Sequence, residues 1–227
     1  MELKALIFDV DGTLAETEEV HRQAFNETFA AQGIAWHWSK EDYRTLLRTT
    51  GGKERMAKHR GTTGSGPSDA QIAELHKAKT KRYVEIIASG QVDLLPGVAE
   101  LIARARAAGL RIAIATTTTR ANVDALIEAT FRRPPTDLFE VIAAGDEVAK
   151  KKPAPDVYLL ALQTLGLPPA ACLAFEDSRA GLASAKAAGL RVVLTPSEYT
   201  RGDDFSVADW LIADLTAAAT KDIPDLP

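Results

Sequence analysis

Two aspartates stand at alternate positions near the start of the chain, in the stretch ALIFDVDGTL. Asp9 and Asp11 follow an apolar run at residues 6–8, which is typical of a strand buried on both faces. Residues two apart in a strand point the same way, and Gly12 ends the strand, so both carboxylates should face a ligand. Burying them costs several kcal/mol unless a cation such as Mg2+ offsets their charge. A polar strand end followed by a turn would give the same pattern, so other parts of the sequence must decide between this structure and a cation site.

Other apolar runs also end in residues that could do chemistry. LRIAIAT ends in Thr116, and Thr117 with two more threonines leads into a helix, whose free backbone amides favour an anion. Three lysines at 150–152 follow the run FEVIAAG, and CLAFED ends in Glu176 and Asp177. Carboxylates, a lysine and a helix start around one point would suit a phosphate held by Mg2+.

Such a site predicts phosphoryl transfer. One aspartate can attack phosphorus in line and form an aspartyl-phosphate, provided that Mg2+ and a lysine offset the charge of the phosphoryl oxygens. Asp11 could protonate the leaving sugar oxygen and later take a proton from water. Because the ordinary pKa of aspartate is near 3.9, we expect this role to need a raised pKa, for instance through desolvation under a closed lid.

The order of the elements predicts how these residues are positioned. Strand and helix patterns alternate after about residue 92, which indicates an α/β fold with a Rossmann-like parallel sheet and helices on both faces. Residues 16–91 show helical patterns only. We therefore predict a core of residues 1–15 and 92–227 and an inserted helical cap at 16–91. The cap would lie over the carboxyl ends of the strands as a lid.

The cap segment carries its own signals for helix ends. Ser39 with Asp42, and Ser68 with Gln71, have the spacing of capping boxes and predict two helix starts. The stretch GTTGSGPS, residues 61–68, is rich in glycine and serine and is expected to be a flexible connection.

Composition limits the class of protein. The chain has 227 residues, 46% of them hydrophobic, and a formal net charge of −4, which argues against a nucleic-acid partner. The single cysteine, Cys172, excludes an internal disulfide, and no stretch approaches the ~20 apolar residues of a membrane span. The chain shows no apolar signal region at its start. We expect a cytoplasmic protein without a membrane partner, and a monomer because the cap already covers the site.

Four motifs resemble those of the haloacid dehalogenase superfamily of phosphohydrolases, in the subgroup with a helical cap after strand one. They are D-x-D-G-T, Thr116 after a strand, Lys152 in KKPAPD, and Glu176 with Asp177. In the cap, AETEEVHRQAFNETFA and TTGGKER resemble the CbbY phosphatases, which are found beside Calvin-cycle genes and are similar to β-phosphoglucomutase. The resemblance implies a Mg2+-dependent enzyme that removes phosphate from a small sugar bisphosphate, xylulose 1,5-bisphosphate, an inhibitor of Rubisco.

The resemblance also implies the roles of the core residues. Asp9 becomes the nucleophile and Asp11 the general acid and base. Mg2+ would be held by Asp9, by the backbone carbonyl of Asp11 and by Asp177, with Glu176 behind them or as an additional ligand.

Hydroxyl and amine groups would hold the phosphoryl group. The resemblance gives this role to Thr116 and Lys152, with Thr117 beside them as a substrate-binding residue. Lys152 is chosen because it directly precedes P-A-P-D, and we expect Lys150 and Lys151 to be solvated.

The cap residues expected to bind substrate are Glu16, His21, Gly51, Gly52 and Lys53. Lys53 could meet a second phosphate. The alternative for His21 is a histidine on a helix face whose hydrogen bonds are made within the protein. The alternative for the loop is that TTGGKE is a simple turn. Arg55 and Lys79 could add positive charge or could be surface residues.

Several functions share these residues. A sugar phosphomutase of the β-phosphoglucomutase type uses the same core but returns the phosphoryl group to the sugar, and the difference lies in how well the cap excludes water. A phosphatase for another small phosphate, such as phosphoglycolate, is argued against by TTGGKER. A phosphate-binding protein without activity would lack a motif acid, and none is missing.

Overall fold

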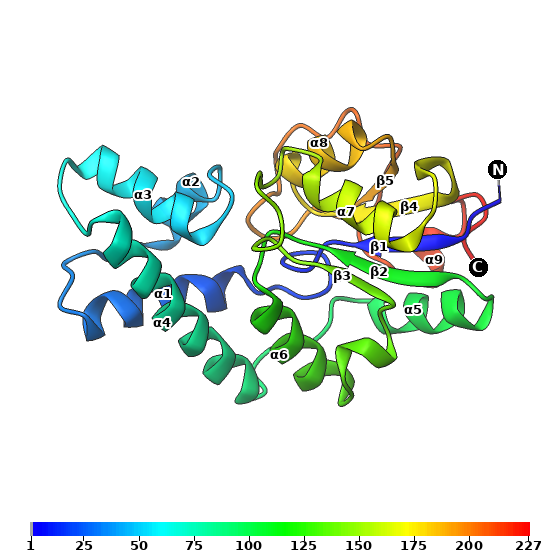
Figure 1. Ribbon diagram of the computed structural model, residues 1–227. Coiled ribbons are helices and arrows are strands. Elements are labelled where there is room, and N and C mark those ends of the chain that lie inside the picture. Colours follow the sequence, from blue (N-terminus) through cyan, green and yellow to red (C-terminus); the bar gives the residue numbers. More distant parts are fainter. Residues whose placement is uncertain (1) are drawn as a thin grey trace.

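Six parallel strands form one sheet in the order β3-β2-β1-β4-β5-β6. The computed structural model describes residues 2–227 and is shown in Figure 1. The strands are β1 (Ala5–Phe8), β2 (Arg111–Ala115), β3 (Val141–Ala143), β4 (Cys172–Glu176), β5 (Arg191–Leu194) and β6 (Trp210–Leu211). β1 lies between β2 and β4, with Phe8 beside Ile114 on one neighbour and Phe175 on the other. The predicted Rossmann-like α/β sheet is confirmed.

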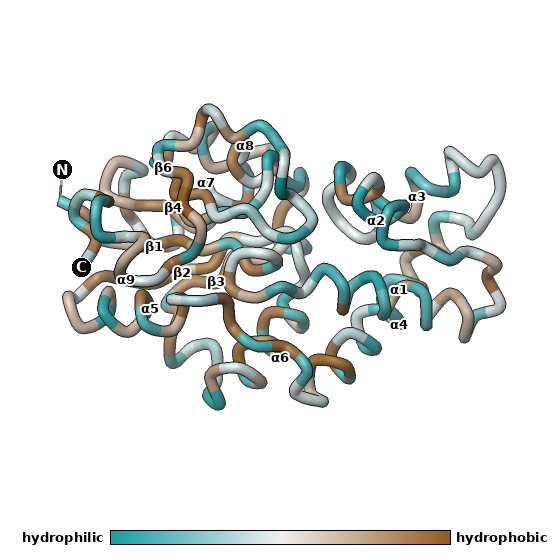
Figure 2. Tube along the Cα trace, turned by 180° about the vertical axis from the view of Figure 1, so that it is seen from behind, coloured by the Kyte–Doolittle hydropathy of each residue, from teal (hydrophilic) through white to brown (hydrophobic). Residues whose placement is uncertain are grey.

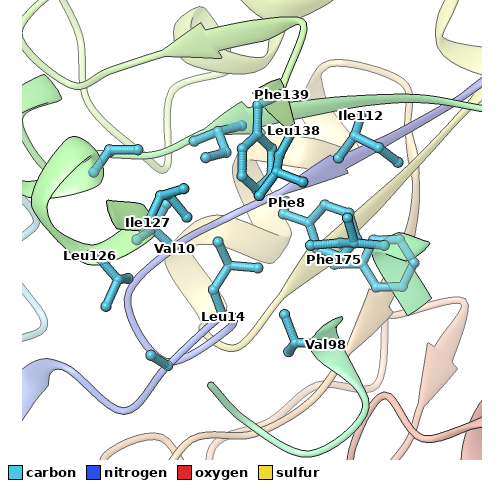
Figure 3. Packing of buried hydrophobic residues seen from close by; sticks show 14 of the residues in the cluster. Phe8, Val10, Leu14, Val98, Ile112, Leu126, Ile127, Leu138, Phe139 and Phe175 are labelled. Atoms are coloured by element: carbon cyan, nitrogen blue, oxygen red, sulfur yellow. The ribbon is translucent and has the colours of Figure 1, made fainter. Parts of the chain in front are cut away.

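Helices cover both faces of the sheet. The helices of this lobe are α5 (Val98–Ala107), α6 (Arg120–Phe131), α7 (Asp156–Leu165), α8 (Arg179–Ala187) and the short α9 (Ala217–Thr220). Because side chains alternate along a strand, Leu6 and Phe8 join the cluster under α5 and α6, whereas Ala5 and Ile7 join the cluster under α7 and α8. Figure 3 shows the first cluster, in which the rings of Phe8 and Phe175 stack at 4.5 Å.

Strands buried on both faces need to be apolar throughout, and Figure 2 shows β1 and β4 as a largely hydrophobic centre. The residue that follows such a run is the first that can be polar. The site residues therefore stand where the strands end.

A second lobe consists of helices, to the left of the sheet in Figure 1. They are α1 (Glu18–Ala31), α2 (Lys40–Leu46), α3 (Gly52–Thr63) and α4 (Asp69–Ala88). Both predicted capping boxes are present, at Ser39 and at Ser68. Aromatic side chains, with Trp38 and Phe29 fully buried, fill the centre of this lobe. Residues 18–88 thus hold only helices as regular elements, while the exact bounds of the cap stay a prediction.

The expected flexible connection at residues 61–68 is wrong for its first part. α3 continues to Thr63, and the hydroxyls of Thr62 and Thr63 donate to backbone carbonyls one turn earlier. The helix ends at Gly64, whose left-handed conformation lets its N–H donate to Arg60 O. Hydrogen bonds inside the helix therefore outweigh the low helix propensity of GTT.

The two lobes join through paired connections and a shared core. Ala15 and Leu94 form an antiparallel bridge, so the chain enters and leaves the helical lobe side by side. Tyr83 and Ile87 of α4 belong to the same buried cluster as α6. Within residues 2–227, no helix is long and apolar enough to span a membrane.

Candidate active site

Three carboxylates meet at the carboxyl ends of β1 and β4. Asp9 follows β1, Glu176 ends β4 and Asp177 follows it, and all three side chains are buried. Each offers an oxygen within 4.8 Å of those of the other two. The sequence predicted this convergence from the parallel sheet, and the structure brings the three acids together.

Lys152 is the cation inside this cluster. Its ammonium donates to Asp9 Oδ1 and to Glu176 Oε1, each at 2.6 Å, and to Ala115 O at 2.9 Å. Burial alone lowers the pKa of Lys152, but the two carboxylates outweigh it and raise the pKa above its ordinary value. Lys152 is therefore charged, and one positive charge faces three buried acids.

One lysine does not neutralise three buried acids, and this cluster fits a divalent cation. Burial, with the neighbouring Glu176 and Asp11 adding to it, raises the pKa of Asp9 to about 8 despite Lys152. Burial and the neighbouring carboxylates also raise the pKa of Asp177 well above its ordinary value. Glu176 Oε2 is buried without a hydrogen-bond partner. The negative charge of these acids is therefore disfavoured until a further cation offsets it, and such hard oxygen donors are the ligands that Mg2+ prefers.

Asp11 faces the helical lobe instead of this cluster. Its Oδ1 accepts a hydrogen bond from the Thr17 hydroxyl and lies 3.1 Å from Nε2 of His21. Because the carboxylate can only accept, Nε2 is the donor, and Nδ1 of the neutral ring accepts from Lys79 Nζ. The ring of His21 also stacks on Tyr83, with 4.2 Å between centroids. A chain of contacts thus links Lys79 on α4 to Asp11 in the core.

The protonation of this chain differs from the sequence expectation. Burial acts to raise the pKa of Asp11, but His21 and Thr17 outweigh it and lower the pKa to about 2. Burial and the Lys79 charge lower the pKa of His21, and burial lowers that of Lys79 to about 7. The raised pKa that the acid role was expected to need is therefore not found at Asp11, because its hydrogen-bond donors Thr17 and His21 are buried with it.

Thr116 lies buried at the end of β2, where its hydroxyl accepts from the backbone N–H of Thr118. Thr119 caps the following helix α6, its side chain accepting from the backbone N–H of Asn122. Thr117 lines the cavity described next. The threonine run thus forms a tight turn that leads into a helix start, as the sequence predicted.

A cavity of about 950 Å3 is lined by both lobes. Its lining includes Asp9, Asp11, Lys152 and Asp177 from the core, and His21, Gly51, Gly52 and Lys53 from the cap. Glu16 lies apart from this group: it is half-buried, and its carboxylate accepts the backbone N–H of Glu198.

Three positively charged side chains that could have been surface residues are buried or half-buried. Arg55 is buried and donates to the hydroxyl of Tyr43, which donates in turn to Glu18. Lys79 is 3% exposed, so the surface alternative is wrong for both residues. Lys151 is half-buried at the cavity and donates to Gly145 O, which also corrects the expectation of a solvated side chain.

Comparison with known proteins agrees with this geometry. The family model described as haloacid dehalogenase-like hydrolase matches residues 3–189. The chain belongs to the haloacid dehalogenase-like hydrolases.

Its relatives include the protein CbbY of Rhodobacter capsulatus, 86% identical over the whole length of both chains. CbbY of Rhodobacter sphaeroides has been solved with phosphate and, as a mutant, with xylulose 1,5-bisphosphate. Each of these structures is 53% identical, covers 94% of this chain and 95% of its own, and superposes with a TM-score of 0.92. The resemblance to the family and to its CbbY members is confirmed.

Within this hydrolase, several contacts of the carboxylates in and around the cavity have little or no signal in the sequence. Thr17 stands at the N-cap position of α1, which is the one signal that could have pointed to its hydroxyl. Tyr158 donates to Glu176 from α7, and Tyr199 donates to Glu19 from the loop after β5. No spacing in the sequence indicates these last two contacts, because they depend on how the helices and loops pack.

Proposed function

We propose that the chain is a Mg2+-dependent phosphatase that removes one phosphate from xylulose 1,5-bisphosphate. The observation that carries the proposal is the cavity, which has Asp9 and Lys152 in its lining together with the exposed cap cations Arg44, Arg48 and Lys53. Within residues 2–227 these three cap side chains form no ion pair, so their charge is available to a second phosphate. The R. sphaeroides CbbY complex with this bisphosphate supports the substrate.

In the first step, the Asp9 carboxylate attacks phosphorus in line and the bond from phosphorus to the sugar oxygen breaks. A proton of the Lys79 ammonium passes through His21 to Asp11 and on to the leaving oxygen, and the acyl phosphate of Asp9 remains on the enzyme. Lys152 and the backbone amides after Thr116 offset charge on the phosphoryl oxygens.

In the second step, water attacks phosphorus and gives a proton to Asp11, from which it returns through His21 to Lys79. The bond from phosphorus to Asp9 breaks, and inorganic phosphate and free Asp9 are released. Mg2+ held by Asp9, by Asp177 and by the Asp11 carbonyl would supply positive charge at the phosphoryl group. Glu176 would support that site from behind or join it.

The experiment is phosphate release with Mg2+ from xylulose 1,5-bisphosphate, beside ribulose 1,5-bisphosphate, β-glucose 1-phosphate and phosphoglycolate at equal concentration. We expect a preference of several hundredfold for the xylulose compound, equivalent to more than ~3 kcal/mol in the transition state. A flat profile would overturn the substrate assignment. An isomerised sugar phosphate without free phosphate would identify a mutase instead.

Two further properties stay predictions of ours. A monomer is supported by the cap lying over the site, and size-exclusion chromatography with light scattering would test it. A cytoplasmic location is supported by the single cysteine, which is buried. Fractionation of the source cells would test the location.

A further inference from the structure

Tyr158 lies directly beneath the carboxylate cluster. It is fully buried on α7, and its hydroxyl donates to Glu176 Oε1 at 2.7 Å. The Lys152 ammonium stands 5.0 Å from the centre of its ring. Because a carboxylate can only accept, the Tyr158 hydroxyl is the donor in this bond.

The three donors of the Lys152 ammonium are all in use. They go to Asp9, to Glu176 and to the carbonyl of Ala115, and an ammonium has no fourth. Lys152 can therefore bind a phosphoryl oxygen only if it releases one of these partners. Ala115 ends β2, where the sheet holds its carbonyl in place.

Release of Glu176 would ordinarily be costly. Its side chain is fully buried, and Oε2 has no hydrogen-bond partner, so Lys152 and Tyr158 supply all of its donors, both on Oε1. A buried carboxylate left without any donor is strongly destabilised. The Tyr158 hydroxyl prevents that state, because it stays on Oε1 after Lys152 has turned away.

We propose that Tyr158 is a positioning residue that keeps Glu176 paired and so lets Lys152 transfer one hydrogen bond from Glu176 to the phosphoryl group. Tyr158 touches neither the substrate nor the reacting atoms and acts through Lys152. This inference rests on the proposed phosphatase function.

Tyr158→Phe is the test variant, since it removes the hydroxyl and keeps the ring against Lys152. We expect kcat to fall about tenfold or more, because one hydrogen bond to a charged group is at stake. KM for xylulose 1,5-bisphosphate should change less than threefold, since the cap contacts that bind the rest of the substrate are untouched. Thr164→Val is the matched control, because it removes an exposed hydroxyl from the same helix, and its kcat should equal that of the parent protein.

Calorimetric titration with Mg2+ in the absence of substrate separates the proposal from a role at the metal. We expect the Mg2+ affinity of Tyr158→Phe to stay within twofold, because Glu176 keeps its bond to Lys152 when no phosphoryl group is bound. An unchanged kcat, an equal loss in Thr164→Val, or a matching loss of Mg2+ affinity would each overturn the proposal.

The same comparison with p-nitrophenyl phosphate keeps this inference apart from the substrate assignment. If the parent protein hydrolyses p-nitrophenyl phosphate but does not prefer xylulose 1,5-bisphosphate, the substrate is wrong and the kcat loss of Tyr158→Phe is still expected. If the loss is missing with p-nitrophenyl phosphate as well, the inference about Tyr158 is wrong.

Discussion

Gly12 sets the distance between the strand-one turn and the acid Asp177. Its backbone has a φ of +80°, and a Cβ built there would lie 2.3 Å from Asp177 Oδ2 and 2.9 Å from Ser197 Cβ. Ordinary contact begins at 3.4 Å, so in Gly12→Ala the Asp177 carboxylate has to retreat by about 1 Å. An acid proposed to bind Mg2+ would then be out of place.

Gly109 offers a matched control for this substitution. Its φ is +81°, and a Cβ there meets nothing within 4 Å. Both alanine variants should therefore lose ~1–2 kcal/mol of unfolding free energy from the left-handed backbone. Gly12→Ala should lose a further ~1–3 kcal/mol through the clash, and its Mg2+ affinity should fall ~10–100-fold.

Urea unfolding measures the stability of both variants, and calorimetric titration measures their Mg2+ affinity. The reasoning predicts that Gly109→Ala binds Mg2+ as the parent protein does. If the two variants lose the same stability and both keep the parent affinity, the placement of Asp177 against the strand-one turn is refuted.

Three more predictions concern pH, the cap and its closure. Burial raises the pKa of Asp9 from 3.8 to about 8. The folded protein therefore keeps a proton that the unfolded chain loses, and the stability that this proton provides is lost as the pH rises from 3.8 to about 8. Because Mg2+ displaces this proton, its affinity should rise by up to ~10-fold per pH unit in the same interval. An equal Mg2+-induced rise in melting temperature at pH 6 and pH 8 would contradict this. Lys53→Ala should raise KM for bisphosphates far more than for monophosphates, and equal losses would remove Lys53 from the second-phosphate site. Tyr199→Phe deletes the hydroxyl that donates at 2.7 Å to Glu19 across the two lobes; amide exchange in α1 should speed up, and an unchanged rate would show that this bond does not hold the cap.

The core of the site could be predicted because it follows from topology. Asp9, Thr116 and Glu176 each stand directly after an apolar run in a strand, and parallel strands bring those ends to one edge of the sheet. The resemblance to the family motif then pointed to Lys152, which directly precedes P-A-P-D, among three neighbouring lysines. The structure places that lysine, and not Lys150 or Lys151, on the carboxylates.

The cap contacts could not be predicted in the same way. His21 and Lys79 are 58 residues apart, on two helices whose rotation about their axes depends on packing throughout the lobe. The lowered pKa of Asp11 could not be predicted for the same reason, because the sequence shows that the carboxylate becomes buried but not which donors are buried with it. Tyr158 carries no signal beyond its place on an amphipathic helix.

The central claim is that Asp9 carries the phosphoryl group during turnover. Rapid acid quenching during hydrolysis of xylulose 1,5-bisphosphate, followed by peptide mass spectrometry, tests it most directly. We expect one phosphoryl group on the peptide that contains Asp9, and none in Asp9→Asn, which should keep its fold and lose turnover. Hydrolysis that proceeds without a phosphorylated enzyme, or with the phosphoryl group on another residue, would contradict the account.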